Sequence, residues 1–275
     1  MPSYLVTGVS RGIGYEFLRQ ISAKTDNVVV GLVRDKASTE KKVAADSELK
    51  SRSNIHIVHG DLSDYDSLKK SVEEVTPIVD GKLDYIIANA ALMSQYAVFQ
   101  TISESASLDP QKFEEDMIAN FRTNVIGNIH LFTLYLPLVL AGSVKKVIAI
   151  SSGMADLDLV RRYRLGLSAP YSISKAALNA AAVKFHVEYV DRGVLFLNVC
   201  PGLVDTGGFA NATPEQQQIA EKQFASFQEY APDLKGPSPP EESVAKILPT
   251  IEKASLEEGY GGEFISHKGK GEKWL

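Results

Sequence analysis

The segment YSISK, residues 171 to 175, places the phenol of Tyr171 four positions before the ammonium of Lys175. On a helix, side chains at this spacing lie on one face. A cation about 4 Å from a phenol, at an effective dielectric of about 20, is worth roughly 4 kcal/mol. That energy would lower the pKa of a tyrosine from about 10 by up to about three pH units. The spacing predicts general acid–base chemistry near neutral pH, although an ordinary helix-surface pair has the same spacing.

A second chemical motif lies near the start of the chain, in the segment YLVTGVSRGIGYEF. Its glycines fall between a strand-like run and a helix-like run. Gly8 permits a tight turn, Gly12 lets the backbone approach a diphosphate, and Gly14 allows close packing of helix on strand. The N-terminus of the helix then faces the phosphates. The pattern predicts a dinucleotide-binding loop; a tight turn without a ligand is the alternative.

The charge at the end of the next strand-like run bears on the choice of dinucleotide. The run VVVGLVRD ends with Val33 and Arg34, where dinucleotide folds often carry an acidic residue for the adenosine ribose. A guanidinium pairs far better with a 2′-phosphate than with a hydroxyl, and Arg11 could reach the same group. We therefore predict NADP(H) as the cofactor. Asp35 weakens the signal, and a solvated arginine at a strand end is the alternative.

Six short runs rich in β-branched residues predict the strands that position these motifs. Most are apolar at consecutive positions, which is typical of parallel strands buried on both faces. They are Tyr4–Thr7, Val28–Val33, Ile55–Val58, Tyr85–Ala88, Lys146–Ile150 and Leu195–Val199. Helical stretches lie between them, among them Tyr15–Ser22, Ser67–Val75, Gln111–Leu140 and Ser172–Tyr189. This alternation predicts an α/β fold with a doubly wound parallel sheet in a single domain, residues 1–275.

The alternation of predicted strands and helices ends after the last of these strands. An apolar face at steps of 4, 3 and 4 predicts an amphipathic helix within Thr213–Tyr230; its members are Ala220, Phe224, Phe227 and Ala231. Ser238, Pro239 and Glu241 then predict a capping box with proline at the first helical position. Residues 205–240 are the predicted substrate lid.

The composition bounds the function. The chain has 275 residues, 29 of them Lys or Arg and 34 Asp or Glu, for a net charge of −5. This balance argues against a nucleic-acid or anionic-membrane partner. The single cysteine, Cys200, fits a reducing compartment and a place in the core. We expect no signal peptide and no uncharged apolar stretch of about 18 residues, and hence a cytoplasmic location. The histidines show no ligand spacing, so no metal site is predicted.

Taken together, the motifs resemble those of the short-chain dehydrogenase/reductase family along nearly the whole chain. They stand in order as TGVSRGIG at 7–14, HGDLSD at 59–64, ANAA at 88–91, NVIG at 124–127, SSG at 151–153, YSISK at 171–175 and PGLVDT at 201–206. Ala91 replaces a glycine of the family's pattern. The ending GGEFISHKGKGEKW also resembles small carbonyl reductases of the sniffer and C-factor kind, and fungal ketoreductases.

This resemblance implies a Rossmann fold and roles for the matching residues. Tyr171 would act as general acid, Lys175 would hold the nicotinamide ribose, and Ser152, with Ser151 as a rival, would bind the carbonyl oxygen. Asn124 would hold a water behind Lys175. The residues implied in binding NADP(H) are Gly8, Ser10, Arg11, Gly12, Ile13, Gly14, Arg34, Asp61, Leu62, Asn89, Ala90, Tyr171, Lys175, Pro201, Gly202, Val204 and Thr206.

One interval departs from the family's pattern. Tyr171 follows Ser152 by 171 − 152 = 19 positions, more than the family usually has. The extra residues are expected to form either a longer loop at the substrate mouth or a surface loop without contact to substrate. Tyr163 is a weaker candidate for the acid, because Leu167 and not a lysine follows it at the same spacing.

These features predict an NADPH-dependent carbonyl reductase that transfers hydride to a small ketone or aldehyde. Many relatives pair through the helices that contain Asn124 and Tyr171, so a homodimer or tetramer is one expectation and a monomer the other. A catalytically silent dinucleotide sensor or scaffold is the alternative from another class. An epimerase or dehydratase of the longer relatives fits poorly, because the glycine spacing and the chain length differ.

Overall fold

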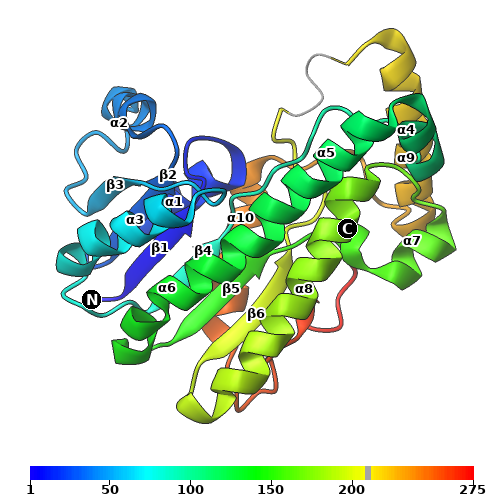
Figure 1. The fold of residues 1–275 in the computed structure, drawn as a ribbon. Helices are drawn as coiled ribbons and strands as arrows, with labels where there is room; N and C mark the ends of the chain where they lie inside the picture. The colour runs from blue at the N-terminus through cyan, green and yellow to red at the C-terminus, as the bar shows by residue number, and fades with distance from the viewer. Residues whose placement is uncertain (208–211) are drawn as a thin grey trace.

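A parallel sheet forms the centre of the protein (Figure 1). The computed structural model describes residues 1–207 and 212–275. Within them, seven strands lie in the order β3-β2-β1-β4-β5-β6-β7, and every neighbouring pair is parallel. Their bounds are β1 Ser3–Thr7, β2 Val28–Val33, β3 Ile55–His59, β4 Tyr85–Ala88, β5 Lys146–Ile150, β6 Leu195–Cys200 and β7 Phe264–Ser266.

Helices cover both faces of this sheet, as Figure 1 shows. One core cluster joins the sheet to α1 and α10, and includes Phe17 and Ile247. The other joins it to α3, α6 and α8, and includes Phe132 and Leu178. The predicted doubly wound α/β fold is therefore confirmed. The helices concerned are α1 Gly12–Ser22, α3 Tyr65–Ile78, α6 Gly127–Ala141, α8 Ala169–Tyr189 and α10 Pro240–Lys253, with α2 Lys36–Ala45 beside β3.

The central strands form where they were predicted because they are buried from both sides. All residues of β1, β4, β5 and β6 are buried, which explains why most of their residues are apolar at consecutive positions. The short β7 was missed, since three residues are too few to show a pattern. The strand order reverses between β1 and β4, and the carboxyl ends of these strands form the crevice where such sheets bind ligands.

The long helix predicted within Gln111–Leu140 is interrupted. It consists of α5 Pro110–Phe121, a five-residue π-helix Arg122–Ile126, and α6. The expectation that no uncharged stretch is long enough to span a membrane is wrong by composition, since residues 125–142 carry no charged side chain. Among the described residues, the stretch Pro110–Ala141 has the length and hydropathy of a spanning helix, and half of its most apolar window is buried within the fold. A core helix of this sheet has those properties.

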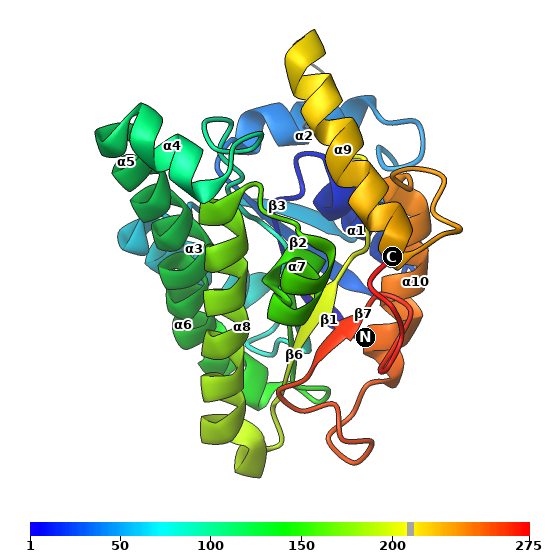
Figure 2. The ribbon, with the colours of Figure 1, turned by 90° about the vertical axis from the view of Figure 1, so that its right-hand side faces the viewer.

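Three further helices lie on the right-hand side of the molecule in Figure 1, and Figure 2 shows the first and the last of them in the chain on opposite sides of that end. They are α4 Ile102–Leu108, α7 Leu157–Tyr163 and α9 Pro214–Tyr230. The insertion before Tyr171 therefore contains a helix, α7, and not only a lengthened loop. The predicted amphipathic helix is α9, which starts with a capping box at Thr213. Residues 208–211 of the predicted lid lie outside the described residues.

The predicted capping box at Ser238 is wrong. Helix α10 begins at Pro240, with Pro239 as its N-cap and no side-chain cap among the described residues. The Ser238 hydroxyl and main-chain N–H both donate to the main-chain oxygen of Leu203, at 3.2 and 2.9 Å. Ser238 is thus committed to a parallel bridge with Val204, and its oxygen is turned away from the helix.

Candidate active site

The glycine loop joins β1 to α1 at the carboxyl edge of the sheet. Gly8 and Gly12 have φ values of +76° and +56°, a backbone region that other residues adopt at a cost. A Cβ on Gly14 would collide with the carbonyl oxygen of Gly8. Among the described residues, no side chain caps the N-terminus of α1, whose N-cap is the exposed Arg11. The helix therefore presents unpaired N–H groups and its positive dipole end, which fits a diphosphate.

Thr7 links this loop to the end of β4. Its hydroxyl oxygen accepts hydrogen bonds from the main-chain N–H groups of Asn89 and Ala90, at 3.0 and 2.9 Å. The Asn89 side-chain amide donates to the Thr7 carbonyl oxygen at 3.0 Å. Thr7 is buried, so these bonds lock the two strand ends that border the crevice. Thr7 belongs to the glycine motif, but nothing in the sequence predicts this contact.

At the end of β2, Val33 is buried while Arg34 and Asp35 are exposed. The Asp35 carboxylate accepts from the main-chain N–H of Ser38 at 2.9 Å and so caps α2. It therefore faces its own helix and is not available to the ribose side of the strand. Asp35 therefore does not weaken the prediction that Arg34 selects NADP(H), because its carboxylate caps α2.

A third cation lies beside the glycine loop and was missed from the sequence. The Lys42 ammonium donates to the main-chain oxygen of Ser10 at 2.9 Å and lies 4.0 Å from the centre of the Tyr15 ring. Arg11, within the loop, and Arg34, at the end of the neighbouring strand β2, are exposed cations of the same region. No pattern could have found it, because α2 lacks an apolar period and its orientation comes from packing beside β3.

Asp61 and Leu62 follow β3. The Asp61 carboxylate accepts from the main-chain N–H and the hydroxyl of Ser63, at 2.8 and 2.7 Å. Leu62 is buried, and a Cβ on Gly127 would collide with its carbonyl oxygen. Leu62 therefore fixes the turn after β3 against α6, and Asp61 remains half-buried at the edge of the sheet.

The four predicted catalytic residues come from three elements. Ser152 follows β5, Tyr171 and Lys175 lie one turn apart on α8, and Asn124 lies in the π-helix. The Ser152 side chain lies close enough to the Tyr171 phenol to lower its pKa. The Lys175 ammonium is buried and donates to the main-chain oxygen of Ile150 at 2.7 Å. The structure thus brings Ser152, Tyr171 and Lys175 together where β5 ends.

Burial, and not the neighbouring cation, decides the acidity of Tyr171. Burial raises the pKa of Tyr171 to about 12, the Cys200 thiol adds to the rise, and the hydrogen bond with Ser152 opposes it. Lys175 lies 5.7 Å from the centre of the phenol ring, and burial lowers its own pKa to about 8. The expected lowering of the tyrosine pKa is therefore wrong for this structure, because desolvation outweighs the ammonium. The phenol is therefore protonated at neutral pH, a state that would suit a proton donor.

Asn124 has a structural role that its motif alone does not reveal. Its side chain is fully buried, accepts from the Leu92 N–H at 2.7 Å, and donates to the Leu92 carbonyl oxygen at 2.8 Å. It also donates to the Ser174 hydroxyl at 2.9 Å, next to Lys175. Its own carbonyl oxygen accepts from the Asn128 side chain at 2.8 Å. A π-helix at this point is consistent with a functional site.

The segment after β6 closes the crevice. Gly202 has a φ of +84°, and a Cβ there would come within 2.8 Å of the His267 ring, so Pro201 and Gly202 pass close beneath the end of β7. Thr206 lies beside the glycine loop, since its Cγ2 would be 3.4 Å from a Cβ on Gly12. Val204 pairs with Ser238 in an isolated bridge. These contacts place the segment 201–206 between the glycine loop and the end of β7.

The rival residues occupy different positions. Ser151 is buried, its N–H donates to Val199 in the sheet at 2.8 Å, and its hydroxyl has no partner in the described part of the chain. Tyr163 lies in α7, with its ring edge against Tyr230 at 5.2 Å between centres. The geometry therefore favours Ser152 over Ser151 and Tyr171 over Tyr163.

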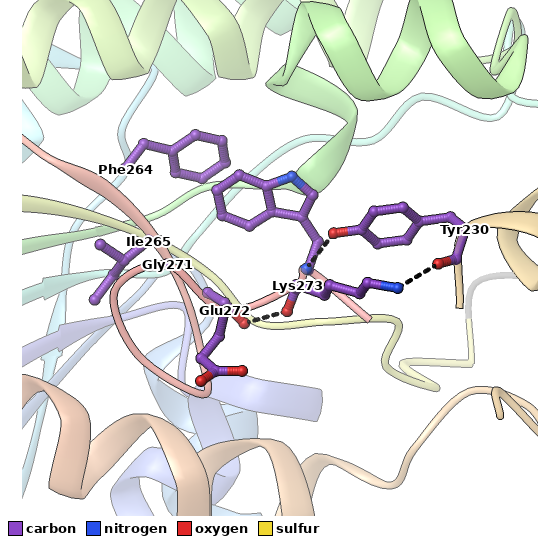
Figure 3. A pocket seen from close by; sticks show the side chains of 8 residues that line it. Tyr230, Phe264, Ile265, Gly271, Glu272 and Lys273 are labelled. Carbon is purple, nitrogen blue, oxygen red and sulfur yellow. Dashed lines mark hydrogen bonds between the residues drawn. The ribbon is translucent and has the colours of Figure 1, made fainter. Parts of the chain in front are cut away.

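Two cavities lie in this region of the structure, and the larger one is not lined by Ser152, Tyr171 or Lys175. A cavity of about 280 Å³ lies beside the last residues of the chain, lined among others by Tyr230, Phe264 and Trp274 (Figure 3). A cavity of about 10 Å³, lined among others by Asp116 and Tyr171, is large enough for about one water. We place the catalytic position by its side chains and not by cavity size. Among residues 1–207 and 212–275, no cluster of side chains suited to a metal ion was found.

Fold and side chains together define a dinucleotide-binding oxidoreductase, and comparisons with known proteins agree. The family model described as short chain dehydrogenase matches residues 3–217. Short chain dehydrogenase virK of Hypocrea virens is 50% identical over 275 residues, with 100% of both chains covered. Short-chain dehydrogenase/reductase iacC of Pestalotiopsis fici is 46% identical over 276 residues, again with 100% of both covered.

Solved structures show the same fold. An NADPH-bound carbonyl reductase from chicken fatty liver superposes with a TM-score of 0.78 at 24% identity, covering 100% of this chain and 94% of that one. Carbonyl reductase Sniffer of Drosophila melanogaster gives a TM-score of 0.74 at 22% identity, with 98% of each chain covered. The chain belongs to the short-chain dehydrogenase/reductase family.

Proposed function

We propose that this oxidoreductase is an NADPH-dependent carbonyl reductase that reduces a ketone or aldehyde with Tyr171 as general acid. The observation that carries the proposal is the buried Lys175 ammonium, held by the Ile150 carbonyl oxygen and 5.7 Å from the centre of the Tyr171 ring, with Ser152 close enough to lower the pKa of that phenol. These side chains stand at the carboxyl edge of the sheet, on which the glycine loop also opens. Two structural neighbours, a carbonyl reductase with NADPH bound and the carbonyl reductase Sniffer, support the same choice.

The chain's own residues divide the work. NADPH, when bound, supplies the hydride. Tyr171, protonated at neutral pH, donates its proton to the carbonyl oxygen as negative charge develops there. The Ser152 hydroxyl donates a second hydrogen bond to that oxygen. The Lys175 ammonium, fixed by the Ile150 carbonyl oxygen, places positive charge behind the phenol and favours the phenolate that the proton transfer leaves.

The dinucleotide would be held by the loop and the strand ends. The N–H groups at the start of α1 would bind the diphosphate, and Gly8 and Gly12 leave the backbone open to it. Arg34, with Arg11 and Lys42 nearby, would pair with the 2′-phosphate of NADPH. Asp35 does not compete for this place, because it caps α2. These cations support NADPH over NADH.

The test is NADPH oxidation by the purified protein with a panel of ketones, aldehydes and diketones, in wild type and in Tyr171→Phe. We expect Tyr171→Phe to bind NADPH normally and to lower turnover at least about 100-fold, the usual scale of general acid catalysis. Tyr163→Phe is the matched control and should keep its turnover. If Tyr171→Phe keeps full turnover, the assignment is wrong. If the wild type binds NADPH but reduces nothing, the alternative of a dinucleotide sensor or scaffold gains support.

A further inference from the structure

Trp274 touches the turn that carries Ser152. Its indole N–H donates to the Asp156 carboxylate, at 2.7 Å from Nε1 to Oδ2. At the other end of the turn, a Cβ built on Gly153 would lie 3.3 Å from the Trp274 Cβ and 3.4 Å from its Cγ. The tryptophan side chain therefore contacts both ends of the segment 153–156, directly after the serine of the site.

The same turn is held from the inside by β6. The Gly153 N–H donates to the Cys200 sulfur at 3.1 Å, and the Met154 N–H donates to the Ser152 hydroxyl oxygen at 3.2 Å. The Ser152 hydroxyl thus takes its position from the path of the turn. Cys200 fixes that path on the sheet side, and Trp274 fixes it on the opposite side.

Asp156 extends this contact into the insertion. Its Oδ1 accepts from the main-chain N–H groups of Asp158 and Leu159, at 2.9 and 3.2 Å, and so caps α7. Its Oδ2 is taken by Trp274. One carboxylate therefore joins the indole to the N-terminus of the inserted helix, and the indole sets the direction in which α7 leaves the site.

The last residues of the chain, here called the tail and including Lys273 and Trp274, also contact the end of α9. The Trp274 main-chain N–H donates to the Tyr230 hydroxyl at 2.9 Å, and the Tyr230 ring meets Tyr163 of α7. The indole stacks on Phe264 of β7, with ring centres 4.3 Å apart. In Figure 3, Phe264 lies to the left of Lys273 and Tyr230 lies to its right. Trp274 therefore connects β7, the insertion and the predicted lid.

We propose that Trp274 is a positioning residue for carbonyl reduction, which sets the Ser152 hydroxyl through the turn 153–156 and ties α7 to α9. This proposal rests on the proposed function for its catalytic part. When the indole N–H is lost, the turn loosens, and the hydroxyl no longer meets the carbonyl oxygen in one orientation. A displacement of about 1 Å at such a group can lower the rate roughly 100-fold.

The experiment uses two variants that break the same bond from its two sides. Trp274→Phe keeps an aromatic ring against Gly153 and removes the donor. Asp156→Asn keeps an oxygen able to cap α7 and places an amide where the indole needs a carboxylate. Lys273→Met is the matched control: it removes a neighbouring tail contact, the 3.1 Å bond from its ammonium to the Tyr230 carbonyl oxygen, and leaves the indole in place.

Three readouts separate positioning from simple anchoring. We expect Trp274→Phe and Asp156→Asn to lower kcat at least about 10-fold, a fraction of what misplacement can cost, with the Kd for NADPH unchanged. Hydrogen exchange should quicken in 157–163 in both variants, and the double variant should be no worse than either single one. Lys273→Met should match the wild type in kcat and in exchange of 157–163.

The outcomes are distinguishable from failure of the proposed function. Hydrogen exchange needs no substrate, so it tests the tie between Trp274 and α7 even if the wild type reduces no carbonyl compound. Unchanged exchange in both variants overturns the proposal. Faster exchange with unchanged kcat also overturns it, because Trp274 is then an anchor of the tail and does not position Ser152. If Trp274→Phe fails to fold, Asp156→Asn decides by the same readouts.

Discussion

Replacing Arg34 with alanine should remove most of the preference for NADPH over NADH. The two coenzymes differ only in the 2′-phosphate, and Arg34 is exposed at the end of β2, where its side chain is free to reach that group. Its main chain is fixed, since the His59 ring nitrogen Nδ1 lies 2.9 Å from the Arg34 carbonyl oxygen. The guanidinium therefore starts from a defined point on the strand exit.

The size of the effect follows from one charge-assisted pair. Such a pair contributes roughly 1.5–3 kcal/mol, which corresponds to about a 10- to 150-fold preference. Asp35 should not oppose it: turning its carboxylate toward a ribose would break the 2.9 Å bond to Ser38 and cost about 1 kcal/mol of capping energy. Arg11 and Lys42 remain in Arg34→Ala, so a small preference should survive.

The assay is kcat/KM for NADPH and for NADH with one carbonyl substrate. Wild type, Arg34→Ala and Arg192→Ala are compared at equal ionic strength, because screening changes such pairs. Arg192 is the matched control, an exposed arginine that precedes β6 at the opposite edge of the sheet. Equal use of both coenzymes by the wild type, or an unchanged ratio in Arg34→Ala, would refute the reasoning.

Further predictions concern the acid pair, the lid and the π-helix. Because the pKa of Lys175 is lowered to about 8, its ammonium is lost above that pH; kcat/KM for reduction should fall there, and a profile flat to about pH 10, the ordinary range of lysine, would contradict this. Hydrogen exchange in α9, which has no buried residue, should slow when NADPH and a carbonyl compound are added; equal rates would argue against a lid. Asn124→Ala should lower the free energy of unfolding by about 2–6 kcal/mol in urea titrations, since both main-chain groups of Leu92 lose a buried partner; a fall below about 1 kcal/mol, the value of one ordinary hydrogen bond, would contradict it.

The sequence predicted those parts of the fold that depend on residues close together in the chain. Consecutive apolar residues made β1, β2, β4 and β5 visible because both faces of these strands are buried. The glycine spacing indicated the loop because Gly14 cannot carry a side chain against the Gly8 carbonyl oxygen. The π-helix around Asn124 could not be predicted from a sequence pattern, because it depends on contacts between distant residues, such as the hydrogen bonds of Asn124 with Leu92.

Contacts between distant residues could not be predicted. Thr7 meets Asn89, and Trp274 meets Asp156 across 118 positions of the chain, and neither pair shows a spacing of its own. The prediction that the pKa of Tyr171 is lowered was wrong for a related reason. The four-residue spacing indicates that a cation is near, but the pKa depends on how deeply the phenol and the ammonium are buried, and that depth is set by β5, β6 and the tail.

The two halves of the site are built in different ways, and this difference has consequences for mutation. The dinucleotide half stands on strands buried along their whole length and on main-chain bonds such as those of Thr7. Changes there should damage stability and coenzyme binding together. In the proposed function, the substrate half would consist of α7, α9 and the C-terminal residues around Trp274, which meet through a few side chains, and α9 has no buried residue. If the proposed function holds, changes in that half should alter which carbonyl compound fits while leaving the sheet and the coenzyme site intact, because little of the core depends on them.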